Sequence, residues 1–284
     1  MKNSKIKKQY GFFQLFNLII QLTFIDMMKQ YKGSIFSWLW ILGAPILFTA
    51  TYIFGLAIGG DFTNGLININ GVEYSQISWL LIGSSVWTYI GTAVVKSCNS
   101  IKEYRWIVVG IGVPIFIPPI FTNLSKLWIG IFSFILSVLV YIIIWFASNS
   151  STPIFTWHLL QVPLVFLFIL LFLTLLSLVM APISAVSKDM TQIIILLPAV
   201  LAWLSAVTIQ PQNSFYTNPN TLDIIMRINP FYHLLDQARQ SILGYSNGEF
   251  WWVSHVSFWS FILVLLALSI FITKKFKKHI ADII

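Results

Sequence analysis

The charged residues of this chain, which could do ionic or acid–base chemistry, lie between long apolar stretches and not inside them. Six stretches are long and apolar enough to cross a bilayer, and none contains a charged residue. Ion-coupled carriers place such residues within their spans, so that class is not favoured. An intramembrane hydrolase needs a nucleophile beside a base at membrane depth, but the histidines all fall outside the centres of the stretches. They are His158, His233, His255 and His279.

Metal and nucleotide sites have no better support. His233 and Asp236 are three residues apart, but two ligands are too few for a metal site. Cys98 is the single cysteine, which excludes an intramolecular disulfide. No glycine directly precedes a lysine, so the phosphate-binding Gly-x-x-x-x-Gly-Lys-Ser/Thr loop is absent. We expect no metal or cofactor on this chain and no enzymatic activity of its own. If the chain transports, another polypeptide must hydrolyse the nucleotide.

Aromatic and hydroxyl residues at helical spacing suggest a lined path instead. In the stretch 36–58, Trp38, Pro45 and Tyr52 recur every seven residues, and Thr49 lies close by. At 100° per residue this spacing places them on one helix face. Aromatic faces can stack on sugar rings without fixing them tightly, which suits a polymer that must slide.

The stretch 191–210 repeats the pattern. Thr191, Pro198 and Ser205 recur every seven residues, and Trp203 is near them. The alternative interpretation is packing, because small and polar residues also mediate contacts between membrane helices. The spacing leaves both interpretations open.

Composition determines the fold class that must position these residues. Only 9% of the 284 residues are charged, against roughly 25% in an ordinary soluble domain, and 57% are hydrophobic. We therefore predict an all-α integral membrane protein that forms one transmembrane domain over residues 1–284. The six predicted spans are approximately 36–58, 76–95, 127–147, 159–186, 191–210 and 253–272.

The distribution of cations predicts the topology. The net charge of +8 could indicate a nucleic-acid partner, but the cations lie in short clusters between apolar runs, so no such partner is expected. With six spans and both termini in the cytoplasm, 15 of the 17 lysines and arginines fall in cytoplasmic segments, as the positive-inside rule requires. We predict a multi-pass protein of the cytoplasmic membrane whose basic clusters face anionic membrane lipids.

The N-terminal residues 9–32 are predicted to form an amphipathic helix in the cytoplasmic interface. The uncharged run 11–25 is about five residues short of the roughly 20 needed to span. It is also not followed by the small-residue cleavage site of a secretory signal. The helix ends at a basic junction where the chain turns into the first span. This junction consists of Lys29, Tyr31, Lys32 and Gly33.

Two connecting segments are longer than simple turns. The inner loop 96–126 has an amphipathic start and a proline-rich break from Pro114 to Pro119. The outer segment 211–252 is semi-apolar, so we expect re-entrant helices that dip into the outer leaflet before the last span.

Four motifs together resemble those of a known family. They are Tyr31-Lys32-Gly33-Ser34 followed by Leu39-Trp40 and Pro45, the spaced prolines Pro114 and Pro118, the step Lys188-Asp189, and Asn229-Pro230 followed by Arg239. In this order the motifs resemble the membrane subunit, or permease, of type-2 ABC exporters. The resemblance is to the branch that exports polysaccharide such as O-antigen, capsule and teichoic acid. Two departures are Lys188, where arginine is usual, and the run 107–112, which lacks the lysines often found there.

The resemblance implies a homodimer of this subunit with two copies of an ATPase subunit, which would hold ATP and Mg²⁺. The loop 99–112 would supply a cytoplasmic coupling helix, and ATP binding would tilt it together with the interface helix. A groove lined by the first and fifth spans would pass a lipid-linked glycan outward. The contacts to the ATPase would be Ile101, Lys102, Glu103, Tyr104, Arg105 and Trp106. The alternative is that these charges anchor the loop to lipid.

Among glycopolymers, teichoic acid or a related wall polymer is placed slightly ahead. The lysine-, isoleucine- and asparagine-rich composition resembles that of a low-GC genome, and residues 21–40 resemble that branch. Two alternatives stay open, namely a type-2 exporter of drugs or peptides and a non-transporting membrane scaffold subunit. Co-purification with an ATPase would separate transport from a scaffold.

Overall fold

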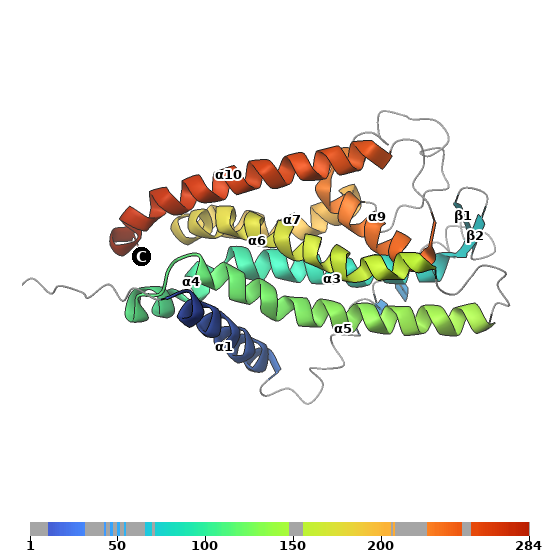
Figure 1. The fold of residues 1–284 in the computed structure, drawn as a ribbon, viewed down its shortest axis with the longest axis horizontal. Coiled ribbons are helices and arrows are strands. Elements are labelled where there is room, and N and C mark those ends of the chain that lie inside the picture. The colour runs from blue at the N-terminus through green and yellow to red at the C-terminus, as the bar shows by residue number, and fades with distance from the viewer. Residues whose placement is uncertain are drawn as a thin grey trace, which may run out of the picture.

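The described part of the chain is α-helical apart from short 3-10 and π segments and one hairpin (Figure 1). The computed structural model describes residues 11–31, 43, 46, 47, 50, 51, 54, 66–69, 72–147, 156–205, 207, 226–245 and 251–283. Only the backbone is described for residues 30, 31, 67–69 and 277–283.

Four of the described helices are long and apolar enough to cross a membrane. These helices contain the predicted spans 76–95, 127–147 and 253–272 and nearly all of 159–186, and they agree with an all-α membrane protein. They are α3 (Gln76–Cys98), α5 (Ile117–Ala147), α6 (Val162–Val186), which the 3-10 helix η2 (Trp157–Gln161) precedes, and α10 (Trp251–Ile283).

The other two predicted spans are described in part. The span 36–58 lies largely outside the described residues, although isolated positions such as Leu47 and Ala50 are helical. The span 191–210 corresponds to α7 (Lys188–Leu204), a helix of 17 residues. It starts before residue 191 because the Ser187 side chain caps it by accepting the amide N–H of Met190. The arrangement of six spans therefore stays a prediction.

One end of the bundle gathers α1 (Phe12–Tyr31), α4 (Ser100–Glu103) and the C-terminal end of α10, while α9 (Pro230–Leu243) and the hairpin lie toward the other end (Figure 1). We call the first end the basic end because the elements that meet there carry most of the described cations. These are Lys29, Lys96, Lys102, Arg105, Lys126, Lys188, Lys274 and Lys275. Such clustering at one end is the pattern that the positive-inside rule predicts for a cytoplasmic face.

Helix α5 begins at Ile117, well before the predicted start at residue 127. Pro118 and Pro119 lie in its first turn, where a backbone N–H has no helical partner and a proline is tolerated. The helix therefore contains Lys126, and its first turns form part of the basic end.

A two-stranded hairpin was not predicted. Strands β1 (Leu66–Ile69) and β2 (Val72–Ser75) pair antiparallel with Leu66 opposite Ser75, directly before α3. The signal was in the sequence, since Asn70-Gly71 between two short apolar runs is typical of a two-residue hairpin turn. The prediction of an all-α fold did not include this hairpin.

Helix α3 is the centre of the bundle and packs against α5, α6, α7 and α9. In an apolar stretch of 18 residues within α3, 78% of the residues are buried. In the corresponding stretches of α5 and α10 the share is 28%. The outer face of α5 carries a stripe of exposed apolar side chains at helical spacing, which can face lipid or another helix. The stripe consists of Trp128, Phe132, Ile135, Leu139, Ile143 and Phe146.

The close contact between α3 and α5 depends on Gly130. A Cβ atom added there would lie 2.5 Å from Cγ of the buried Tyr89 ring. We expect Gly130→Ala to lower stability by about 1–3 kcal/mol through overpacking, measured as the midpoint of thermal unfolding in detergent. Gly91→Ala is the matched control in α3, because its added Cβ would meet Pro198 only at 3.4 Å. Equal midpoints for the two variants would contradict this account.

Candidate functional site

Helix α1 has two apolar faces. The inner face packs against a cluster that includes Tyr104 and Phe121 and consists of Leu15, Leu18, Ile19 and Leu22. The outer face is exposed and consists of Phe12, Phe13, Phe16, Ile20, Phe24, Ile25 and Met28. The two faces suit a helix that lies along the membrane surface, with one side on the bundle and the other toward lipid.

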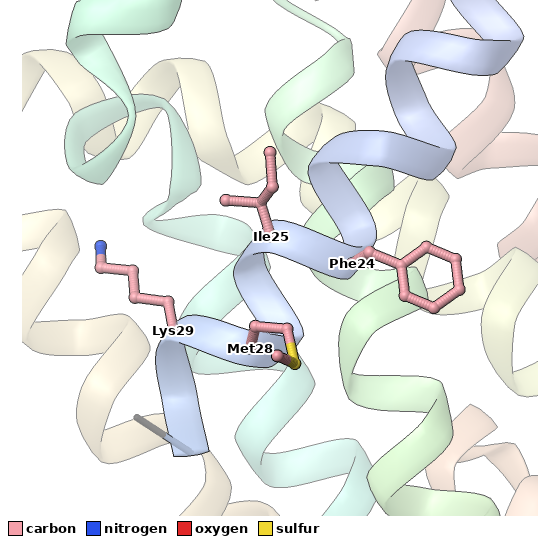
Figure 2. A pocket seen from close by; sticks show the side chains of 4 residues that line it. All are labelled: Phe24, Ile25, Met28 and Lys29. Atoms are coloured by element: carbon pink, nitrogen blue, oxygen red, sulfur yellow. The ribbon is translucent and has the colours of Figure 1, made fainter. Parts of the chain in front are cut away.

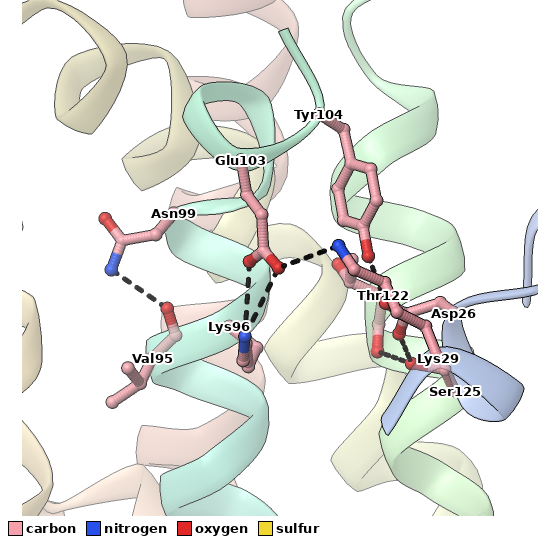
Figure 3. A network of polar contacts seen from close by, with 9 residues as sticks. All are labelled: Asp26, Lys29, Val95, Lys96, Asn99, Glu103, Tyr104, Thr122 and Ser125. Atoms are coloured by element: carbon pink, nitrogen blue, oxygen red, sulfur yellow. Dashed lines mark hydrogen bonds and ion pairs between the residues drawn. The ribbon is translucent and has the colours of Figure 1, made fainter. Parts of the chain in front are cut away.

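The inner face of α1 also carries a buried carboxylate. Asp26 is only 7% exposed, and it accepts hydrogen bonds from the Tyr104 hydroxyl and from the Ser125 hydroxyl, one on each carboxylate oxygen (Figure 3). Tyr104 follows α4 and Ser125 belongs to α5, so one side chain joins three segments. Burial, and then the hydrogen bond to Asp26, raise the pKa of the Tyr104 hydroxyl above its ordinary value, which keeps Tyr104 a donor.

A second group of charges surrounds this buried contact at the surface. Glu103 lies between Lys96, at 3.3 Å, and Lys29, at 3.8 Å (Figure 3). The Lys29 ammonium also lies 5.2 Å from the centre of the Tyr104 ring. These ion pairs are partly exposed, so water and salt weaken them more than the buried contact.

Helix α4 is also tied to α6 and α7. The Ser184 hydroxyl donates to Asn99 Oδ1 at 2.5 Å, and Lys102 Nζ donates to Thr191 Oγ1 at 3.2 Å. Asn99 is the residue directly before α4 and Thr191 lies in the first turn of α7. These two hydrogen bonds hold the loop after α3 against α6 and α7.

The predicted coupling residues separate into two groups. Ile101 and Tyr104 are buried, and Lys102 and Glu103 make the contacts within the chain described above. Arg105 is exposed and Trp106 is 62% exposed. Within the predicted loop 99–112, the helix α4 has only four residues, and a π-helical segment η1 (Ile107–Ile111) follows and ends at Gly112, whose φ is 76°.

The exposed apolar side chains of this loop continue beyond the predicted contact residues 101–106. Val109 and Ile111 are exposed beside Gly110, on the π-helical segment. We call Arg105, Trp106, Val109, Gly110 and Ile111 the exposed loop surface. Its signal in the sequence was the apolar run 107–111 inside a segment expected to face water. Exposed apolar side chains on a polar end are a feature of protein contact surfaces.

The residues of the second aromatic and hydroxyl stripe do not share one environment in the structure. Thr191 contacts Lys102 and Ser184, Pro198 packs near Gly91, and Ser205 is buried and accepts from Asn229 Nδ2 at 3.0 Å. These partners all belong to the same chain and favour the packing interpretation for the three residues. Trp203 has no such burial and is 66% exposed.

Several predicted residues lie outside the described part of the chain. They are Trp38, Pro45, Thr49 and Tyr52 of the first stripe and Lys32 and Gly33 of the junction. Of the remaining junction residues, Tyr31 ends α1 and Lys29 makes the contacts given above.

An open hollow of about 610 Å³ lies beside the C-terminal half of α1. The described side chains that line it are Phe24, Ile25, Met28 and Lys29, and Figure 2 shows Phe24 and Lys29 extending to opposite sides of the helix. Three of these four side chains are apolar, which suits contact with a lipid chain.

The other end of the bundle contains a buried arginine. Arg239 of α9 is 1% exposed, and its guanidinium lies 3.4 Å from the centre of the Trp79 ring. Arg239 also donates from an Nη atom to the Val207 carbonyl at 2.8 Å. A Cβ at Gly83 would lie 2.1 Å from the guanidinium, so only glycine leaves room for it. Sequence reasoning identified Arg239 as part of a motif but missed this packing.

Polar groups on α9 form a network beside Arg239. Asp236 accepts from Tyr245 and Gln240, and burial raises its pKa, although the Tyr245 hydrogen bond and the charge of Arg239 act in the opposite direction. The ring centres of His233 and His255 lie 4.5 Å apart. Burial lowers the pKa of His233 to about 3. Within the described residues, no group of three or more His, Cys, Asp or Glu side chains could hold a metal ion.

Comparison with known proteins extends the similarity over the whole chain. An O-antigen export system permease protein RfbA of Klebsiella pneumoniae is 21% identical over 280 residues, which cover 98% of this chain and 99% of that protein. A protein of the same name from Myxococcus xanthus is 21% identical over 226 residues, which cover 78% and 79% of the two chains. No family model matches the chain. The resemblance to export permeases that the motifs indicated is therefore confirmed.

Arg239 should not be replaceable by lysine. Lysine would keep the charge but lose the planar group that covers Trp79 and reaches the Val207 carbonyl. We expect Arg239→Lys to lower the free energy of unfolding by about 1–3 kcal/mol, measured by thermal unfolding in detergent. The exposed Arg105→Lys serves as control and should change the midpoint little. A midpoint for Arg239→Lys equal to that of the control would refute the role given to the planar group.

The low pKa of His233 predicts loss of stability in acid. The folded protein keeps His233 neutral down to about pH 3, whereas the unfolded chain binds a proton below about pH 6.5. The stability contribution is thus fully present above about pH 6.5 and falls with pH, by at most about 1.4 kcal/mol per pH unit. Unfolding midpoints between pH 7.5 and 5 should show this slope, and His233→Phe should flatten it. An unchanged slope in that variant would assign the effect to other groups.

Proposed function

We propose that this chain is the permease subunit of an ATP-driven ABC exporter that moves a lipid-linked cell-surface glycan across the cytoplasmic membrane. The observation that carries the proposal is the near full-length similarity to two permeases named for O-antigen export. These names favour O-antigen over the teichoic acid that composition placed slightly ahead. Capsular polysaccharide shares the same chemistry of a glycan on a lipid anchor.

The proposed assembly is a homodimer with two ATPase subunits that bind ATP and Mg²⁺. The absence of a phosphate-binding loop in this sequence supports a separate motor. The basic end would face the cytoplasm, with both termini on that side, and would present the exposed loop surface to the ATPase. Trp106 and Ile111 are the apolar side chains best placed to enter a groove on that partner.

The proposed path for the glycan lies between the two copies of the chain. Trp203 on the exposed side of α7 is a candidate to line it, and Trp38 and Tyr52 stay candidates on the first stripe. The hollow beside α1 is suited to a lipid anchor or to a membrane lipid. An exporter of drugs or peptides would use the same assembly with another substrate, whereas a scaffold would need no ATPase.

The direct test is reconstitution of the chain with an ATPase that co-purifies with it. ATP hydrolysis in proteoliposomes should rise when an undecaprenyl-linked O-antigen glycan is added. A rise with drugs or peptides alone would favour the alternative exporter. Failure of any ATPase to co-purify would remove the exporter proposal.

Substitution of the exposed loop surface should weaken the complex. We expect the double variant Trp106→Ala, Ile111→Ser to reduce co-purification of the ATPase at least roughly tenfold, because both apolar anchors would be lost. Trp128→Ala on the exposed stripe of α5 is the control for loss of a surface tryptophan. Equal recovery of the ATPase with both variants would place the docking surface elsewhere.

A further inference from the structure

The buried carboxylate of α1 and the loop after α3 form a mechanical connection. We propose that Asp26 is a positioning residue that ties α1 to the loop through Tyr104, so that a displacement of the exposed loop surface is passed to α1. The inference rests on the proposed function for the source of that displacement. The tie itself rests only on contacts within this chain.

A carboxylate on this face of α1 is costly, which is why it indicates a specific role. The inner-face residues Ile19 and Leu22 are apolar, and the buried Thr23 satisfies its hydroxyl on the Ile19 carbonyl of its own helix. An aliphatic side chain would fill the position of Asp26 without the cost of burying a charge. Buried charges persist where hydrogen bonds compensate them, and Asp26 has a hydroxyl donor on each oxygen. Apolar packing alone would keep α1 against the bundle but would allow it to shift along its own axis. Hydrogen bonds to a charged group depend on geometry and therefore also fix its position along that axis.

Tyr104 is the stronger of the two donors. The Ser125 hydroxyl has one proton and lies within hydrogen-bond distance of both Asp26 and the Thr122 carbonyl, at 2.9 Å from the latter. The Tyr104 ring is buried, with the Phe121 ring 4.9 Å away at a near-perpendicular angle, so its hydroxyl is held toward Asp26. Loss of the Tyr104 hydroxyl should therefore release α1 more than loss of the Ser125 hydroxyl.

The backbone of Tyr104 connects this bond to the exposed loop surface. Its amide donates to the Ser100 carbonyl at 2.8 Å, which ends α4. Its carbonyl accepts from the amides of Ile107 at 2.9 Å and Val108 at 3.4 Å, which begin the π-helical segment. A force on that segment thus acts on the residue whose side chain holds α1. The ion pair between Glu103 and Lys29 joins the same two elements, but it is exposed and screened.

The first measurement uses the chain alone in lipid nanodiscs. Spin labels on Gln21→Cys in α1 and Gly110→Cys in the loop, both exposed positions, report the distance between the elements after Cys98→Ser removes the single native cysteine. The unmodified network should give a narrow distance distribution. Tyr104→Phe, which keeps the ring, should broaden it at least roughly twofold, and Ser125→Ala, the matched control, should broaden it less.

A double variant tests whether the two residues act through one bond. Asp26→Asn keeps the shape of the side chain and should also broaden the distribution, and Asp26→Asn with Tyr104→Phe should be no broader than the wider single variant. Additive broadening would overturn the tie. So would a narrow distribution for Tyr104→Phe.

The second measurement tests transmission in the complex with the ATPase. A fluorescent probe on Gln21→Cys should change its emission when Mg-ATP is added, and Tyr104→Phe should reduce this change at least roughly threefold in complexes that still bind ATP. An undiminished change in that variant would overturn transmission through Asp26. If no ATPase co-purifies, the proposed function fails and transmission fails with it, but the distances in nanodiscs still decide whether the tie exists.

Discussion

The structure depends on the high free energy of an unpaired charge or backbone polar group in a bilayer. Because of this cost, the long described elements are helices, and their cations gather at one end. The same cost explains the buried polar residues that do occur. Asp26 and Arg239 are each surrounded by specific partners, and each connects segments that are distant in the sequence. Hydrogen bonds to these polar groups thus fix how the helices are oriented relative to one another, whereas the remaining contacts are apolar and less directional.

The two polar contacts serve opposite ends of the molecule in different ways. At the basic end, hydrogen bonds around Tyr104 link short segments whose exposed side chains can meet a partner. At the other end, the guanidinium of Arg239 lies over the Trp79 ring and fixes α9 against the central helix α3. The long apolar helices between these two contacts make up most of the bundle.

Much of the fold could be predicted because the length of each apolar stretch and the positions of the cations indicate which segments form membrane-spanning helices. Four predicted spans lie on described helices for this reason. Local exceptions were harder: the prolines at the start of α5 suggested a loop, although a helix tolerates them in its first turn. For the candidate site, spacing showed which residues share a helix face but not toward which neighbour that face turns. Tyr104 was therefore predicted to contact a partner, and its burial against Asp26 was not foreseen.

The glycine at position 83 has a consequence for the divergence of such chains. The guanidinium of Arg239 occupies the volume where any other side chain would begin. A change at either position alone carries a cost, because a larger residue at 83 would collide with the guanidinium and a shorter one at 239 would leave a void beside Trp79. Distant relatives should therefore either keep both residues or have exchanged both. Co-variation of these two positions would mark descent of the α3–α9 contact even where overall identity has decayed.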